Sequence, residues 1–194
     1  MSPQSGRPAP RLLLASLVFV VLAVLAVVLQ RSLLARLPFT QPDLLALVVA
    51  AGALARGPRV AAVWGLLAGL LADLAPPAAG VAGLWTFAYA SAGFAISLLV
   101  HADRRGGRDL FRRTPQGPPR SRPRLAHGFA AAAGTVIATV LHLAGVAVIG
   151  QGTPIDLGNS LVVLAVGAAY VFLLGLVLGR PLTRVLAPTE GVPW

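Results

Sequence analysis

Long apolar runs without a charge constrain this sequence more than any other feature. Residues 12–29 contain no acidic or basic residue, and Ser16 is their one polar side chain. A helix that crosses the bilayer hydrocarbon, about 30 Å thick, needs about 20 apolar residues. The whole chain is 57% hydrophobic and only 11% charged, against about 25% charged in ordinary soluble domains. We therefore expect an all-α integral membrane protein.

A cleaved signal peptide is the alternative interpretation of the first run, because Arg7 and Arg11 precede it. The run is longer than a signal-peptide core and lacks a small-x-small cleavage site at its end. More apolar runs follow along the chain. We interpret residues 12–29 as a retained helix.

The apolar runs predict a six-helix polytopic bundle that forms a single membrane domain over residues 1–194. The longest segment between runs, residues 101–125, is too short for a soluble domain with its own core. The predicted spans are residues 12–29, 37–55, 60–74, 81–100, 126–149 and 157–179.

The second and third spans have an alternative arrangement. Residues 43–55 and 60–74 reach only about 20–23 Å each as helices, so they could form a re-entrant hairpin. That hairpin would place Arg56 and Arg59 near the middle of the bilayer, at about 2.5–3.5 kcal/mol each. Two full crossings let both arginines reach the headgroups, with residues 37–41 extending the second span. We favour two crossings.

Charge predicts the orientation. With six crossings, fourteen of the sixteen basic residues, all arginines, lie on the side of the two termini, which carries a net charge of +11. The opposite side keeps Arg31 and Arg36 against Asp43, Asp73 and Asp156, a net charge of −1. The positive-inside rule therefore predicts that both termini lie in the cytoplasm of a multi-pass protein.

Small residues indicate where helices approach closely. In the third span, Gly65, Gly69 and Asp73 follow one another at steps of four, so they share a helix face. Such spacing is typical of small-xxx-small packing in membranes. Asp73 lies at the outer end of that face, either as a polar helix terminus in a tight turn or as an anchor for an inter-helix or partner contact. Two further stripes predict a tight bundle: Gly83, Thr86, Ala90, Gly93 and Ser97 in the fourth span, and Gly175 with Gly179 in the sixth.

His142 is the one ionisable residue well inside a predicted span, and such residues are candidates for function. A neutral histidine is cheaper to bury than a carboxylate, and Thr135 and Thr139 are near enough in sequence to share hydrogen bonds with it. We interpret His142 as a packing residue. No carboxylate lies deep in a span, which argues against proton-driven transport.

The segment from Asp103 to Arg124 holds eight arginines, four prolines and three glycines. It has little apolar surface to bury, so we expect residues 101–125 to form a disordered basic cytoplasmic loop. Such segments attract anionic lipid at about 1 kcal/mol per charge. Phe111 is its one aromatic residue, so nucleic-acid binding is not expected.

The sequence contains no recognised catalytic motif: GxSxG, HExxH, a P-loop and paired carboxylates are all missing. It has no cysteine, and its three histidines are widely spaced, so neither a metal site nor a cofactor site is expected. We expect a protein that is not an enzyme.

Residues 38–100 carry a resemblance to the rod shape-determining protein MreD family. The matching segments include Gln41-Pro42-Asp43-Leu44-Leu45 and Arg56-Gly57-Pro58-Arg59, followed by the Gly65, Gly69 and Asp73 face. Gly80, Gly83 and the Tyr89 to Gly93 region continue the pattern. The packing or partner-contact candidates are Pro42, Asp43, Gly65, Gly69, Asp73, Gly80, Gly83, Tyr89 and Gly93.

The resemblance implies a non-catalytic scaffold subunit of the bacterial cell-elongation machinery, located in the cytoplasmic (inner) membrane. Its implied partners in peptidoglycan synthesis are the bitopic protein MreC, the actin-like MreB filament, and RodA with its transpeptidase. The family is also similar in fold to the substrate-binding subunits of vitamin transporters. A small-molecule binding subunit is therefore the alternative function, with Trp85, Tyr89, His142 and Asn159 as candidate lining residues.

Overall fold

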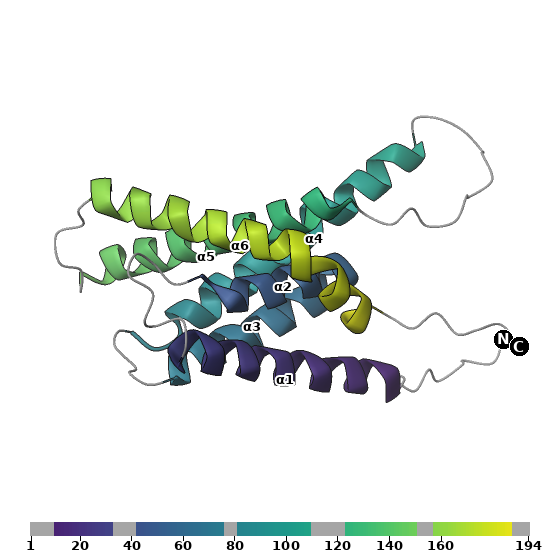
Figure 1. The fold of residues 1–194 in the computed structure, drawn as a ribbon, viewed down its shortest axis with the longest axis horizontal. Coiled ribbons are helices and arrows are strands. Elements are labelled where there is room, and N and C mark those ends of the chain that lie inside the picture. Colours follow the sequence, from purple (N-terminus) through teal and green to yellow (C-terminus); the bar gives the residue numbers. More distant parts are fainter. Residues whose placement is uncertain (1–9, 33–41, 76–80, 110–122, 151–156, 188–194) are drawn as a thin grey trace, which may run out of the picture.

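The computed structural model describes residues 10–32, 42–75, 81–109, 123–150 and 157–187. Within these ranges the regular structure is entirely α-helical, which confirms the all-α prediction and its six helical segments (Figure 1). The helices are α1 (Pro10–Ser32), α2 (Leu44–Ala55), α3 (Pro58–Leu74), α4 (Leu84–Asp109), α5 (Arg124–Ile149) and α6 (Leu157–Leu186).

Four of these helices, α1, α4, α5 and α6, are long and apolar enough to cross a membrane. Their surfaces carry large exposed apolar side chains: Leu13 is 71% exposed on α1, and Val177 is 72% exposed on α6. Contiguous apolar surface of this extent is not compatible with a monomer in water. The protein is therefore a multi-pass membrane protein.

The short helix α2 is the centre of the bundle (Figure 1). It contacts all five other helices, and ten of its twelve residues are buried. The sequence of α2 is apolar on every side, as is typical of a helix that other helices surround completely. At 1.5 Å per residue it is only about 18 Å long.

The most extensive helix contact joins α3 and α4, and glycines make it close. A Cβ atom added at Gly65 would overlap the carbonyl of Tyr89, and one at Gly69 would overlap the backbone of Trp85 and Thr86. The predicted small-residue face of α3 therefore packs directly on the backbone of α4. Gly93 makes the reciprocal approach, because a Cβ there would lie 2.6 Å from the carbonyl oxygen of Ala61 on α3.

The side chain of Trp64 joins α1 to the bundle. Its indole N–H donates a 3.2 Å hydrogen bond to the hydroxyl of Ser16, and its ring stacks on Phe19 with centroids 4.6 Å apart. Both Trp64 and Phe19 are buried. Ser16, the one polar side chain of the first apolar run, thus accepts the hydrogen bond of the buried indole N–H.

The glycine pair of α6 packs on α5. A Cβ added at Gly175 would lie 2.9 Å from the Cα atom of Gly128, and one at Gly179 would lie 2.5 Å from the Cβ atom of His127. This third small-residue contact brings α5 and α6 side by side along their length (Figure 1).

Three helix boundaries differ from the predictions by more than three residues. α4 continues to Asp109, so the prediction of disorder for residues 101–109 is wrong; an existing helix extends without a new nucleation cost. α6 continues through Pro181 to Leu186 instead of ending at Gly179, and the hydroxyl of Thr183 donates to the carbonyl of Gly179 at 2.6 Å. Helix α2 begins only at Leu44, after an N-cap at Asp43. Residues 37–41, residues 110–122 and Gly80 lie outside the described residues.

Candidate functional site

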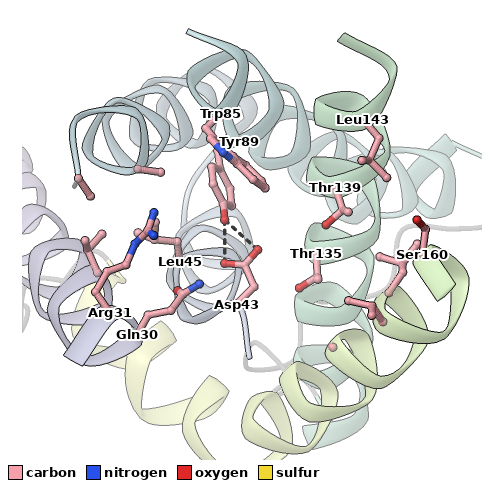
Figure 2. Close-up of a pocket in the computed structure, with 16 residues that line it drawn as sticks. Gln30, Arg31, Asp43, Leu45, Trp85, Tyr89, Thr135, Thr139, Leu143 and Ser160 are labelled. Atoms are coloured by element: carbon pink, nitrogen blue, oxygen red, sulfur yellow. Dashed lines mark hydrogen bonds between the residues drawn. The ribbon is translucent and has the colours of Figure 1, made fainter. Parts of the chain in front are cut away.

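Asp43 connects the centre of the bundle to α4. Its Oδ1 atom accepts a 2.9 Å hydrogen bond from the amide of Ala46, which makes Asp43 the N-cap of α2. The hydroxyl of Tyr89 on α4 donates to the same carboxylate, at 2.7 Å from Oδ1 and 2.8 Å from Oδ2 (Figure 2). Residues separated by 46 positions in the sequence therefore form one polar pair, in which Tyr89 is buried and Asp43 is half-buried.

This pair lines a cavity of about 320 Å³, here called the Asp43 cavity, to which all six helices contribute. From α1, Gln30 and Arg31 reach the side where Asp43 lies (Figure 2). Hydroxyl groups of Thr135 and Thr139 on α5 and of Ser160 on α6 line the opposite side. Its volume is at the lower end of the range for small-molecule pockets, about 300–1,000 Å³.

Three aromatic rings lie in a row beside the Asp43 cavity. Trp85 stacks on Tyr89, with centroids 5.6 Å apart, and on His142, with centroids 3.9 Å apart. Trp85 and Tyr89 line the cavity, whereas His142 and Asn159 do not. The sequence suggested that His142 shares hydrogen bonds with Thr135 and Thr139. The Nδ1 atom of His142 forms no such bond, because it is buried without a partner in the described part of the chain. The hydroxyl of Thr135 instead donates to the carbonyl of Ala131.

Asp73 ends the glycine face of α3 and binds the start of α4. Its Oδ2 atom accepts hydrogen bonds from the amides of Gly83 and Thr86, each 3.0 Å, and from the hydroxyl of Thr86 at 2.6 Å. Its Oδ1 atom accepts from the amide of Trp85 at 3.3 Å. A carboxylate at the first turn of a helix also interacts favourably with the helix dipole. Asp73 thus makes an inter-helix contact, which is one of the two roles that its position allowed.

Two further predicted residues, Pro42 and Gly83, shape the chain next to these carboxylates. Pro42 is buried next to Asp43, and Gly83 forms the turn before α4 with a positive φ of 96°. Side chains rarely adopt that conformation, so the turn requires glycine. The structure therefore separates the predicted set into the α3–α4 contact, its Asp73 end and the Asp43–Tyr89 pair.

Sequence reasoning missed five polar residues of the Asp43 cavity: Gln30, Arg31, Thr135, Thr139 and Ser160. Gln30 and Arg31 lie at the end of α1, Thr135 and Thr139 in the middle of α5, and Ser160 near the start of α6. The predicted six crossings bring the end of α1 and the start of α6 to one side, which gave a weak signal for Gln30, Arg31 and Ser160. The sequence does not reveal which of their side chains point inward.

The described residues contain no group of three His, Asp or Glu side chains that could hold a metal ion. Comparisons with the models of known protein families, with curated proteins and with solved structures gave no match.

Tyr89→Phe tests the Asp43–Tyr89 pair. The change removes the hydroxyl donor and leaves a carboxylate short of a hydrogen bond, which costs about 1–3 kcal/mol. We expect a lower thermal midpoint of the detergent-solubilised protein. Tyr170→Phe is the matched control, since Tyr170 is 39% exposed on α6. Equal midpoints for both variants would contradict the importance of this hydrogen bond.

Proposed function

We propose that this chain is an MreD-like scaffold subunit of the bacterial cell-elongation machinery. The observation that carries the proposal is the packed α3–α4 pair. Gly65, Gly69 and Gly93 form its close contact, and Asp73 binds across its end. These residues are among those on which the resemblance to the MreD family rests. A close contact between two helices of this kind supports a scaffold function.

The proposed topology has six crossings with both termini in the cytoplasm. Helices α1 and α6 respectively begin and end at the same end of the bundle (Figure 1), as expected for an even number of crossings. Arg56, between α2 and α3, donates from Nε to the carbonyl of Leu186 at 2.9 Å. Leu186 is the last residue of α6. Arg56 therefore lies beside the end of a long apolar helix, which supports two crossings over a re-entrant hairpin. In the proposed orientation, this end of α6 is cytoplasmic.

Cysteine labelling tests this topology, since the native chain has no cysteine. Gly57→Cys and Gly117→Cys are expected to resist an impermeant thiol reagent in intact cells and to react in inverted vesicles. Ala78→Cys and Gly152→Cys are expected to show the reverse pattern. A side chain at residue 57 has open space around it, so the change leaves packing intact. Labelling of residue 117 from outside would overturn the orientation, and protection of residue 57 in both preparations would favour the hairpin.

The proposed partners are a bitopic MreC-like protein, an MreB-like filament, and a RodA-like synthase with its transpeptidase. The arginine-rich segment before α5 is proposed to contact anionic lipid on the cytoplasmic side. Co-purification with an MreC-like protein in detergent tests the scaffold function directly. Retention of that partner by the wild-type chain, together with support of rod shape in a complementation assay, is the expected result.

The Asp43 cavity favours one alternative, a substrate-binding subunit of a small-molecule transporter. A cavity of about 320 Å³ with polar groups on two sides is compatible with a substrate. Neighbouring genes distinguish the two functions: genes for MreC and penicillin-binding proteins favour the scaffold, and genes for transport ATPases favour the transporter.

A further inference from the structure

The Asp43 cavity contains a negative and a positive group that are not paired with each other. Among the described residues, the carboxylate of Asp43 accepts hydrogen bonds from Tyr89 and from the amide of Ala46, and no arginine lies within ion-pair distance of it. Arg31 lines the same cavity from α1 (Figure 2). A carboxylate offers about four acceptor positions, so Asp43 retains capacity for a further donor.

Two aromatic rings accompany this carboxylate. The rings of Trp85 and Tyr89 form the adjoining wall of the cavity. A carboxylate and aromatic faces together are suited to an ammonium group, which donates hydrogen bonds and is attracted to ring faces.

Arg31 is suited to the opposite charge. Its guanidinium carries several donors in a planar fork, which match the oxygens of a carboxylate or a phosphate. Arg31 also lines a second, shallow hollow with Val27, Val28, Ser32 and Ala75. That hollow is almost wholly apolar and shares Val27, Arg31 and Ala75 with the Asp43 cavity. A ligand with its oxyanion at Arg31 could therefore extend an apolar chain along α1.

We propose that the Asp43 cavity binds a zwitterion, with its ammonium group on Asp43 and its oxyanion on Arg31. The ligand has two sources with this chemistry: the headgroup of an ethanolamine phospholipid, or a free zwitterionic metabolite. This inference goes beyond the scaffold function and does not depend on it. Co-purification with partners tests the scaffold function, and ligand binding tests the zwitterion site.

Calorimetry on the full-length protein in an uncharged maltoside detergent tests the proposal. Glycerophosphoethanolamine is the soluble probe, and glycerophosphoglycerol, which has the same phosphate without the ammonium group, is its control. Saturable binding of the first, at least tenfold tighter than of the second, is expected. Equal binding of the two probes would overturn the proposal.

Native mass spectrometry with phosphatidylethanolamine and phosphatidylglycerol separates the two sources. Preferential retention of phosphatidylethanolamine supports the lipid headgroup, and binding of the soluble probe alone supports a free zwitterion. If the protein binds neither the soluble probe nor the ethanolamine lipid, the proposal is overturned.

Two variants locate the binding groups. Asp43→Asn keeps an acceptor for the amide of Ala46 but removes the charge, so affinity for glycerophosphoethanolamine is expected to fall at least tenfold. Asp73→Asn, the matched control, removes a carboxylate that does not line the cavity and is expected to leave affinity within twofold. Unchanged binding by Asp43→Asn overturns the assignment of the ammonium group.

Arg31→Gln tests whether Arg31 binds the oxyanion of the ligand. Arg31 is exposed, so its replacement does not threaten folding. It is expected to weaken glycerophosphoethanolamine binding at least fivefold and to leave the binding of ethanolamine, which lacks the phosphate, unchanged. Equal weakening of both probes, or of neither, overturns the assignment of Arg31 to the oxyanion.

Discussion

Replacing Gly69 with leucine is expected to prevent α3 from docking on α4. Even a Cβ atom at this position would overlap the backbone of Thr86 and Trp85, and backbone cannot move aside as a flexible side chain can. Overpacking of a tight contact costs about 1–3 kcal/mol and sometimes more. Because four side-chain carbons meet α4 here, we expect a loss of about 3 kcal/mol or more. That loss lowers the thermal midpoint of a chain of this size by about 10 °C.

Size-exclusion chromatography of heated, detergent-solubilised protein measures this effect. Gly57→Leu is the matched control, since a Cβ atom added there meets no atom within 4 Å. Co-purification with an MreC-like partner should fall with the folded fraction of Gly69→Leu. If Gly69→Leu accumulates and melts as wild type while Leu67→Ala fails, the close face of α3 has been assigned wrongly.

Asp73→Leu is expected to have the second-largest effect. The change removes an acceptor that binds the amides of Gly83, Trp85 and Thr86 and the hydroxyl of Thr86. Buried donors without a partner cost about 1–3 kcal/mol each. Asp73 is half-buried, so water replaces some of these bonds and we expect a total loss of about 2–3 kcal/mol. Thermal midpoint and rod-shape complementation should both decline.

Asp73→Asn separates this structural role from a chemical one. Asparagine keeps one carbonyl acceptor, so it should lose about half as much stability as leucine and retain most rod-shape support. A catalytic carboxylate would lose its activity in both variants, because the amide cannot exchange a proton. Complete loss of support in both variants, with normal protein levels and intact partner binding, would mean that the charge itself has a function beyond the helix contact.

Much of the α3–α4 contact was predictable because its signal is local. Gly65, Gly69 and Asp73 lie four residues apart, and helical periodicity alone brings them to one face. The matching stripe on α4 follows the same rule, with Gly93 against α3. The sequence left two roles open for Asp73, a polar helix terminus in a tight turn or an anchor between helices, and it did not identify the partners of its carboxylate.

The Asp43 cavity was not predictable in the same way. Asp43 and Tyr89 both belonged to the resemblance to the MreD family, yet no periodicity relates two residues on different helices. Gln30 and Arg31 looked like the polar end of a span, and Thr135 and Thr139 like neighbours of His142. Their common cavity depends on the rotation of α1 and α5 about their own axes, which side-chain packing across the bundle determines.

The sequence by itself determined that this chain is helical and enters a membrane, because hydrophobicity and charge act residue by residue along the chain. It also determined the approximate helix positions and the glycine face of α3. Only the tertiary structure decided that α2 lies at the centre, that Asp43 meets Tyr89, and that a cavity opens between charged groups of opposite sign. The physical reason is that these features depend on contacts between distant segments. Such contacts form only when helices of fixed length and shape fill a common volume.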